Sequence, residues 1–321
     1  MLTPAEAPAS SADGLDFERV PCPSCGSGSA RFERALRGFQ LERCASCALV
    51  FVNPRPTEAS LTSLYLRKNP SAQADFYART ISPSQLWEYD RILKDIAGYQ
   101  PAKGRLLDLG CAAGYFMQRA MAAGFEAHGI DLATWVADIT RQRGIANVRV
   151  GKLAEAGFPD AWIDAIHSSQ VLEHLPEPHG ELNEIRRILR PGGILYLNVP
   201  NYQCLSIVLG RDDFELNLPP EHVAYYTPRT LKRLLERTGF EVLRTSSYGG
   251  LKWENLLGRP IRSEIAEAVR PDADPEAQRR LATAPPPNPG VVESTVRGVL
   301  YRGLKVGMTL EAFARKPIGP S

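Results

Sequence analysis

Residues 105–115 have the sequence RLLDLGCAAGY, and they contain the clearest structural signal in the chain. Arg105–Leu109 is a short apolar run typical of a buried strand, and Tyr115 begins a segment with helical periodicity. Gly110 and Gly114 lie in the turn between them, where a glycine lets the backbone approach a ligand without a Cβ in the way. In an open α/β sheet such turns lie in the binding crevice at the carboxyl ends of the strands.

Strands and helices are expected to alternate from Arg105 onward. Short apolar runs separated by amphipathic segments predict βαβ units and a parallel sheet. The expected strands are Arg105–Leu109, Glu126–Asp131, Val148–Gly151, Asp164–Ser168, Gly193–Val199 and Phe240–Thr245, and Thr309–Arg315 alternates like a half-buried strand. The expected helices are Tyr115–Ala123, Ala133–Arg143, Glu181–Leu189 and Pro228–Thr238, the last with Thr227 as its N-cap.

Composition excludes several classes of protein. The chain of 321 residues is 44% hydrophobic, which excludes a wholly disordered chain. Lys and Arg number 38 against 36 Asp and Glu, and a net charge of +2 disfavours a nucleic-acid partner or an anionic membrane. No apolar run approaches the roughly 18 residues of a membrane span. The first residues lack the features of a signal peptide, so a reducing cytoplasm is the expected compartment.

Composition and spacing also suggest an organisation into segments. Residues near the N-terminus are rich in Ala, Ser and Pro, which predicts disorder. The expected organisation is a disordered tail over 1–17, a zinc-ribbon-like domain over 18–56, a helical lead-in over 57–104, and a catalytic domain over 105–321 with an insertion at about 250–305. The sequence assigns no role to this insertion and no oligomeric state.

Four cysteines form two C-x-x-C pairs near the N-terminus. Cys22 and Cys25 are separated from Cys44 and Cys47 by 18 residues, a spacing typical of a zinc site. Four thiolates can surround one Zn²⁺ tetrahedrally and leave no position for a substrate, so a structural zinc ion is expected. Two disulfides or four reduced thiols are the alternatives, and the absence of a signal peptide disfavours disulfides.

An acidic residue at the end of the second expected strand supports a ligand-binding role for the glycine turn. Asp131 follows Gly110 by 21 residues, and a carboxylate there can accept hydrogen bonds from two ribose hydroxyls. The turn reads G-C-A-A-G and therefore lacks the middle glycine of a dinucleotide fingerprint. A plain strand-to-helix turn with a surface aspartate is the alternative interpretation.

Several segments together resemble the class I S-adenosylmethionine-dependent methyltransferases. LLDLGCAAGYF at 106–116 is similar to the first motif of that family, and HGIDL at 128–132 is similar to the second. LRPGGILYLNVPN at 189–201 resembles its fifth strand, and the resemblance covers about residues 80–245. It implies an α/β fold with a Rossmann-like seven-stranded sheet, mostly parallel with an antiparallel last strand, preceded here by the small zinc ribbon.

The same resemblance implies how S-adenosyl-L-methionine binds. Gly110 contacts its methionine end, Asp131 binds the ribose, and Leu132 and Leu153 flank the adenine. Arg91 lies where ubiquinone-pathway relatives carry an arginine for the carboxylate, although a solvated helix charge is an equal alternative. Ala112 departs from the pattern, because many relatives have glycine there. The implied cofactor-binding residues are Asp108, Gly110, Cys111, Gly114, Asp131, Leu132, Leu153, Ser169 and Arg91.

Candidate catalytic residues lie after the fourth and fifth expected strands. His222 and Glu221 lie in LPPEHVAYYTP at 218–228, which resembles the E-H-x-x-Y stretch of sugar C-methyltransferases. His222 is the candidate base, because a base assists methyl transfer to a hydroxyl or an acidic carbon. His174 ends the motif VLEH, where a structural role is as reasonable as a catalytic one. A surface histidine is the alternative for His222.

These residues predict an enzyme that methylates a small molecule. The leading expectation is O-methylation of a sugar or secondary metabolite with S-adenosyl-L-methionine as cofactor. One alternative is C-methylation of a nucleotide-linked sugar. An RNA methyltransferase that grips RNA with its zinc ribbon is a second, which the near-neutral charge disfavours. A non-catalytic binding module with a vestigial cofactor fold is the third.

Overall fold

The computed structural model of the chain describes residues 14–67, 81–208, 219–249 and 298–319. Residues 1–13 of the expected disordered tail lie outside the described residues, and so do residues 250–297 of the expected insertion. Among the described residues, no helix combines the length and the apolarity that crossing a membrane requires.

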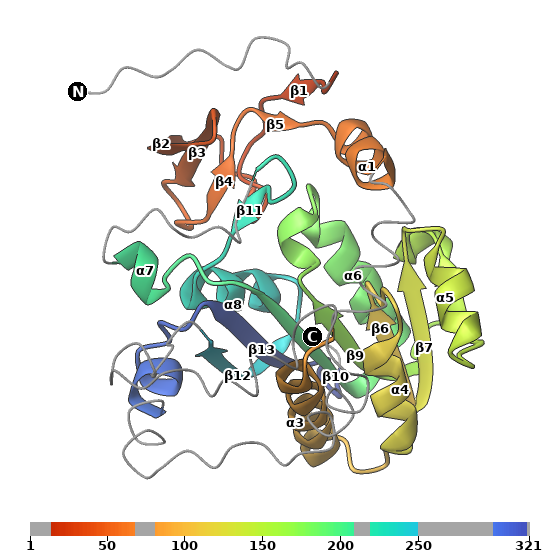
Figure 1. The fold of residues 1–321 in the computed structure, drawn as a ribbon. Coiled ribbons are helices and arrows are strands. Elements are labelled where there is room, and N and C mark those ends of the chain that lie inside the picture. The colour runs from red at the N-terminus through yellow and green to blue at the C-terminus, as the bar shows by residue number, and fades with distance from the viewer. Residues whose placement is uncertain (1–13, 68–80, 209–218, 250–297, 320–321) are drawn as a thin grey trace, which may run out of the picture.

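The central element is a seven-stranded sheet whose order is β8-β7-β6-β9-β10-β13-β12 (Figure 1). The five strands from β8 to β10 are parallel, and β13 runs antiparallel to both of its neighbours. The predicted fold class is therefore confirmed. The strands are β6 (Arg105–Leu109), β7 (Glu126–Asp131), β8 (Val148–Val150), β9 (Ile163–Ser169), β10 (Leu189–Pro200), β12 (Glu241–Tyr248) and β13 (Thr309–Arg315).

The last strand is more deeply buried than its sequence suggested. The alternation in Thr309–Arg315 predicted a half-buried strand, but Leu310 to Ala314 are all buried. The reason is position in the sheet, because β13 lies between β10 and β12 and is covered on both faces. Glu311 is the one charged residue in the buried stretch, and it accepts hydrogen bonds from Arg91 and from the buried Ser246.

Helices cover both faces of the sheet (Figure 1). Leu106 and Leu107 are neighbours in β6 that point to opposite faces, and each belongs to a different hydrophobic core. Leu106 packs with α3 (Pro83–Tyr99), α4 (Tyr115–Ala122) and α5 (Val136–Gln142). Leu107 packs with α6 (Pro178–Ile188) and α8 (Pro228–Arg237). This three-layer arrangement leaves the carboxyl ends of the parallel strands for a binding site.

The N-cap of α8 is the one that the sequence predicted. The Thr227 hydroxyl accepts a hydrogen bond from the backbone N–H of Thr230 at 3.3 Å. In return, the Thr230 hydroxyl accepts one from the N–H of Thr227 at 2.8 Å. Pro228 follows the cap, where its missing N–H costs nothing, and Gly239 ends the helix region with a φ of +80°. Local sequence therefore fixes both ends of this helix.

The cysteine-bearing segment forms a second, antiparallel sheet of order β11-β4-β3-β2. Three strands come from the N-terminal region, whereas β11 lies much later in the chain and consists of residues 224 and 225. Figure 1 shows this sheet above the seven-stranded sheet, with β11 beside β4. The strands are β2 (Ala30–Leu36), β3 (Phe39–Cys44), β4 (Val50–Val52) and β11 (Ala224–Tyr225), and β1 (Phe17–Glu18) pairs with β5 (Arg55–Pro56).

Shorter elements complete the described part of the chain. The helix α1 connects the cysteine-bearing segment to the larger sheet and confirms a helix in the expected lead-in. Two single-turn helices follow β8 and β9, at the edge where the site forms. The elements are α1 (Glu58–Arg67), η1 (Leu153–Glu155), η2 (Leu172–His174), α7 (Leu205–Val208) and the π-helix η3 (Gly298–Gly303).

Candidate functional site

The loop between β6 and α4 presents bare backbone at the carboxyl end of the sheet. Gly110 is exposed between the buried Leu109 and Cys111, and its φ of +77° is a left-handed conformation that suits glycine. A Cβ at this position would lie 2.7 Å from Cγ2 of Val171. Only glycine fits here without displacing a neighbour, and its exposed backbone suits the close approach of a ligand.

The same loop contains an alanine in a conformation that favours glycine. Ala112 has a φ of +42°, in the left-handed region where a Cβ is strained. Its backbone N–H donates a hydrogen bond to Oδ2 of Asp131 at 3.0 Å. Ala112 is the position where the sequence departs from the resembled family, in which many members have glycine. Its backbone adopts a left-handed conformation although the residue carries a Cβ.

Asp131 ends β7 and is almost fully buried. Its Oδ1 accepts hydrogen bonds from the N–H of Ala133 at 2.9 Å and from the hydroxyl of Tyr65 at 3.3 Å. Burial raises the pKa of this carboxyl, and the hydrogen bonds from Ala133, Ala112 and Tyr65 oppose that shift. These donors hold the carboxylate in one orientation beside the exposed Gly110 loop.

Asp108 pairs with a histidine on the neighbouring strand. Its Oδ1 lies 2.7 Å from Nδ1 of His167, and both side chains are buried. Asp108 and His167 are partners in the register of β6 and β9, so parallel pairing places them side by side. Phe116 stacks on the imidazole at 3.6 Å between ring centroids. The pair therefore braces the strand end from which the Gly110 loop departs.

Two further residues predicted to bind the cofactor, Cys111 and Gly114, lie in the same loop and pack against the protein interior. Cys111 is buried, and its Sγ packs so closely on Gly129 that a Cβ there would lie 2.9 Å away. Burial raises the pKa of the Cys111 thiol, which fits packing rather than nucleophilic chemistry. Gly114 has a φ of +75° and precedes α4, where a Cβ would meet Ile145 at 2.7 Å. Both residues shape the loop from below.

The remaining predicted contacts lie at three separate strand ends. Leu132 is half-buried directly after β7, and Leu153 is buried in η1 after β8. Ser169 ends β9, and its hydroxyl donates a hydrogen bond to Oδ1 of Asn198 on β10 at 3.0 Å. These residues lie at the carboxyl edge of the sheet, on strands next to the Gly110 loop.

Arg91 lies on α3 and is already engaged within the protein. Its Nη2 donates to Oε2 of Glu311 at 2.7 Å, and its Nη1 lies 3.4 Å from Oδ2 of Asp95. Glu311 is buried on β13 and also accepts a hydrogen bond from Ser246 at 2.6 Å. A role for Arg91 in binding a cofactor carboxylate stays a prediction. It requires that the guanidinium bind that carboxylate in addition to Glu311 and Asp95.

The predicted catalytic residues meet beside the end of β9. His174 and His222 lie 4.6 Å apart between ring centroids, with their planes nearly perpendicular. Nδ1 of His174 lies 3.0 Å from the backbone oxygen of Glu221. Both imidazoles are half-buried. The contact between His174 and Glu221 joins two segments that are 47 residues apart in the chain.

Glu173 joins this group from a fully buried position. It is 1% exposed, and neither carboxylate oxygen has a hydrogen-bond partner among the residues that the structure describes. Burial raises the pKa of the Glu173 carboxyl to about 8. Ligand atoms of Glu173, His174 and His222 all lie within 4.8 Å of one another. The motif VLEH, which contains Glu173, had left a structural and a catalytic role open, and its sequence did not place it beside His222.

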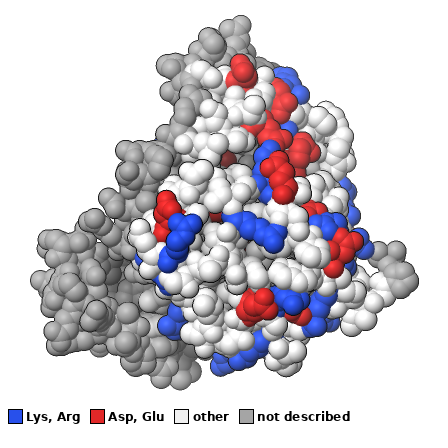
Figure 2. Space-filling view, turned by 90° about the vertical axis from the view of Figure 1, so that its right-hand side faces the viewer, with Lys and Arg blue, Asp and Glu red and all other residues white. Residues whose placement is uncertain are grey.

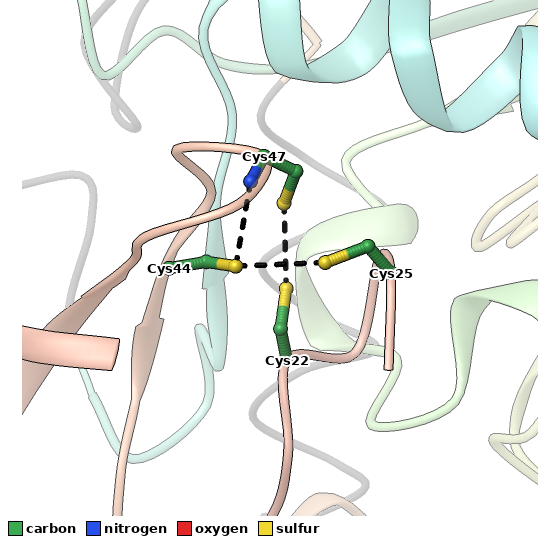
Figure 3. A group of neighbouring side chains, drawn as sticks. All are labelled: Cys22, Cys25, Cys44 and Cys47. Carbon is green, nitrogen blue, oxygen red and sulfur yellow. Dashed lines mark hydrogen bonds between the residues drawn. The ribbon is translucent and has the colours of Figure 1, made fainter. Parts of the chain in front are cut away.

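The four cysteines converge as the spacing predicted (Figure 3). Sγ of Cys22 lies 3.5 Å from that of Cys47, and Sγ of Cys25 lies 3.5 Å from that of Cys44. A tetrahedral zinc ion with Zn–S bonds of about 2.3 Å would hold its sulfurs about 3.8 Å apart. The sulfurs are too distant for disulfides, whose S–S bonds are about 2.05 Å. The donor set fits Zn²⁺, and the neighbouring Cys22 thiol lowers the pKa of Cys47 toward the thiolate form.

Each C-x-x-C pair forms a tight backbone turn. The N–H of Gly26 donates to the oxygen of Cys22 at 2.8 Å, and the N–H of Ala48 donates to that of Cys44 at 3.0 Å. Gly26 and Ala48 both have left-handed φ values, +71° and +68°. Two equivalent turns thus aim four sulfurs at one point, as expected for a structural zinc site.

The cysteine-bearing sheet is joined to the segment that carries His222. Strand β11 pairs with β4 through Ala224 and Phe51, two residues after His222. The N–H of Val223 donates to the oxygen of Glu173 at 2.9 Å. The segment from Glu221 to Tyr225 is therefore held between the cysteine-bearing sheet on one side and η2 on the other.

Polar contacts strengthen the same interface. Nε2 of His179 on α6 lies 2.9 Å from the backbone oxygen of Ser24, and Arg237 on α8 donates to that oxygen at 3.4 Å. The buried guanidinium of Arg55 contacts Glu177 at 3.1 Å and the backbone oxygen of Pro176. The cysteine-bearing sheet is thus fixed to both helices of one face.

Two contributors to the site had no recognisable signal in the sequence. Tyr65 lies on α1, outside the motifs that the sequence offered, yet its hydroxyl donates a hydrogen bond to Asp131. His167 lies inside the apolar strand β9 and is buried. Its contact with Asp108 depends on strand register, which the local sequence does not reveal.

Comparisons with known proteins agree with this geometry. Residues 84–245 match the family described as a methyltransferase domain. A protein described as a probable S-adenosylmethionine-dependent methyltransferase, from Mycolicibacterium smegmatis, is 32% identical over 155 residues. That match covers 48% of this chain, and the chain spans 56% of that relative's length.

One further relative and one solved structure extend the comparison. A ubiquinone biosynthesis O-methyltransferase from Xanthomonas axonopodis pv. citri is 26% identical over 190 residues, which cover 54% of this chain and 80% of that protein. Phosphoethanolamine N-methyltransferase 2 from Haemonchus contortus, solved in complex with S-adenosyl-L-methionine, is 20% identical with a TM-score of 0.54. The match covers 84% of this chain and 63% of that one, and it shows the shared fold alone.

Proposed function

Because the chain belongs to the methyltransferase-domain family, we propose that it transfers the methyl group of S-adenosyl-L-methionine to a small-molecule acceptor. The observation that carries the proposal is the exposed Gly110 backbone beside the buried carboxylate of Asp131. A bare glycine backbone and an oriented carboxylate at neighbouring strand ends suit a nucleoside ligand.

The chain offers a contact for each part of the cofactor. Asp131 would hold the ribose, Leu132 and Leu153 would flank the adenine, and Ser169 and the Gly110 backbone would meet the methionine end. When bound, S-adenosyl-L-methionine supplies an electrophilic methyl group on a sulfonium. The residues of the site then align the acceptor and exclude water, which is the main requirement of an in-line displacement.

An oxygen atom is the acceptor that we favour. The relative from Xanthomonas axonopodis pv. citri is named an O-methyltransferase. His222 and His174 lie at the carboxyl end of β9, where an acceptor would meet the cofactor, and an imidazole there can take the proton of a hydroxyl. Glu221 supplies the backbone oxygen that orients His174. A sugar or a secondary metabolite is the proposed class of acceptor.

A carbon atom of a nucleotide-linked sugar is the second candidate acceptor. The observation that favours it is the E-H-x-x-Y stretch, because Tyr225 is buried in β11 and fixes the loop that carries His222. Incubation with methyl-labelled cofactor and candidate sugars would separate the two, since a methyl ether and a C-methyl group have different carbon NMR shifts. An ether product supports the first candidate.

The face of the described residues that Figure 2 shows gives no support to an RNA substrate. On the face shown in Figure 2, basic and acidic side chains lie interspersed and no basic patch gathers. Several charged side chains of the protein are paired, such as Arg119 with Asp90 and Arg141 with Asp138. A protein that grips RNA through phosphate contacts concentrates basic residues along one surface.

Calorimetry with S-adenosyl-L-methionine tests the proposed function. We expect Asp131→Ala to weaken binding by about 1–3 kcal/mol, the range for lost hydrogen bonds to a charged group. The control is Asp138→Ala, an exposed aspartate on α5, which should bind as the native protein does. Failure of the native protein to bind the cofactor would instead favour a non-catalytic module.

A substitution at His222 tests the acceptor side separately. We expect His222→Ala to lower turnover about 100-fold or more, the usual effect of losing a base, with little change in cofactor affinity. Unchanged turnover would exclude His222 from the chemistry and leave the cofactor assignment intact.

A further inference from the structure

Glu173, His174 and His222 form a cluster that neither cofactor binding nor zinc binding by the cysteines requires. Their ligand atoms lie within 4.8 Å of one another, whereas a tetrahedral site with bonds of about 2.0–2.1 Å needs separations of roughly 3.4 Å. Small side-chain rotations close that difference. We propose that these three residues bind a divalent transition-metal ion, distinct from the zinc expected at the four cysteines.

The strongest support is the environment of Glu173. The side chain is 1% exposed, and both carboxylate oxygens lack a hydrogen-bond partner among the described residues. A buried carboxylate without partners costs several kcal/mol, so folded proteins normally pair such a group or neutralise it. A cation beside Glu173 removes this cost. No basic side chain in the described part of the chain forms an ion pair with Glu173.

The orientation of His174 supplies independent support. A backbone oxygen can only accept a hydrogen bond, so the oxygen of Glu221, 3.0 Å away, receives the proton on Nδ1. In the neutral imidazole this places the lone pair on Nε2. Metal-binding histidines usually donate their other N–H to a backbone oxygen or a carboxylate in this way. Glu221 therefore acts as the residue that orients a ligand.

The ligand set indicates the class of ion. Two imidazoles and one carboxylate suit Zn²⁺, Mn²⁺, Fe²⁺ or Co²⁺, and sites with three protein ligands keep an open coordination position. The cluster lies after β9, on the side where the proposed function places the acceptor. Resting on that function, the open position would bind an oxygen atom of the acceptor, and His222 would act as a ligand rather than as a free base.

A buried water molecule is the competing occupant. The hydroxyl of Tyr226 is buried without a partner among the described residues, and burial, with a smaller contribution from Glu173, raises the pKa of this hydroxyl. A water between Tyr226 and Glu173 would satisfy both groups without any metal ion. The test must therefore distinguish an ion from a water.

Equilibrium dialysis of the purified full chain, with its cysteine-bound zinc in place, makes this distinction. The probes are MnCl₂ and, separately, ZnCl₂, and bound metal is counted by elemental analysis. We expect the native protein to bind one ion more than the cysteines hold, and His222→Ala and Glu173→Gln to weaken this binding more than 10-fold, because loss of even an outer-shell partner costs 10–100-fold. The matched control is His128→Gln, which disrupts a histidine–carboxylate pair with Glu126 elsewhere.

Each result decides the question. If His222→Ala binds as much Mn²⁺ and as much Zn²⁺ as the native protein does, the proposal is overturned, and a buried water is the occupant. If Glu173→Gln does not fold, the half-exposed His222 gives the same readout through His222→Gln. Cofactor binding by the native protein without this extra ion would refute the metal site alone, whereas the extra ion without cofactor binding would refute the proposed function alone.

Discussion

The backbone N–H of Val52 donates a hydrogen bond to the oxygen of Val223 at 3.0 Å. Val52 belongs to the cysteine-bearing sheet, and Val223 follows His222 directly. Two residues further on, Tyr225 pairs with Val50 in the same sheet. The cysteine-bearing sheet therefore supports the segment that carries His222, although the four sulfurs themselves offer no position for a substrate.

Together with the zinc ion predicted at the four cysteines, this connection predicts that losing that ion loosens the His222 loop. In Cys44→Ser we expect loss of the zinc and faster amide hydrogen exchange over residues 221–226, because β4 loses its anchor. Exchange in β6 and β7 should stay unchanged. The control is Cys204→Ser, since Cys204 is a buried cysteine outside the two C-x-x-C pairs. Zinc loss without faster exchange at 221–226 would show that the loop is held by other contacts.

Tyr65 is expected to support cofactor binding through Asp131. Tyr65→Phe removes a hydrogen bond of 3.3 Å to Oδ1, and we expect cofactor affinity to fall by about 0.5–1.5 kcal/mol. Calorimetry measures the change, with Tyr99→Phe as the control because its ring packs against Phe313. Tighter binding by the variant would mean that Tyr65 occupies the place of the ribose.

Ala112 is expected to be strained in the native protein. Its φ of +42° disfavours any residue with a Cβ, so Ala112→Gly should raise the free energy of unfolding by up to about 1 kcal/mol. Glycine also increases the conformational entropy of the unfolded chain, and this effect reduces the expected gain in stability. Ala113→Gly is the control in the same loop and should destabilise, because Ala113 is buried and lies outside the left-handed region. Urea unfolding measures both, and destabilisation by both variants would contradict the strain.

Glu181 on α6 predicts a pH dependence of stability. Burial, with a smaller contribution from Glu184, raises the pKa of its carboxyl from 4.5 to about 7. The folded state thus favours the protonated form, so this contribution to stability is complete below about pH 4.5 and is lost as pH rises through 7. Glu181→Gln should reduce the loss of stability between pH 5 and pH 8.

The measurement for Glu181 is urea unfolding of both proteins at the two pH values. Glu236→Gln serves as the control, because Glu236 is 46% exposed and lies on the surface of α8 beside Lys232. An identical pH dependence in the native protein and in Glu181→Gln would contradict the prediction.

The sequence alone determined the features that depend on neighbouring residues. The ends of β6 and β7 fall where the apolar runs predicted them, and Thr227 caps α8 because its partner lies only three residues away. The meeting of four sulfurs followed from spacing as well, since each C-x-x-C turn aims both of its side chains to one side. In such cases the deciding contacts are local or follow from a fixed spacing.

Only the tertiary structure decided which distant segments share the site. It placed β13 at a covered position in the sheet, it joined Tyr65 to Asp131, and it brought His222 to Glu173 and His174. Strand order and the packing of whole elements create these contacts, and the local periodicity of the sequence does not predict them. The cysteine-bearing sheet supports the His222 loop for the same reason, because the pairing of β11 with β4 joins residues that lie far apart in the chain.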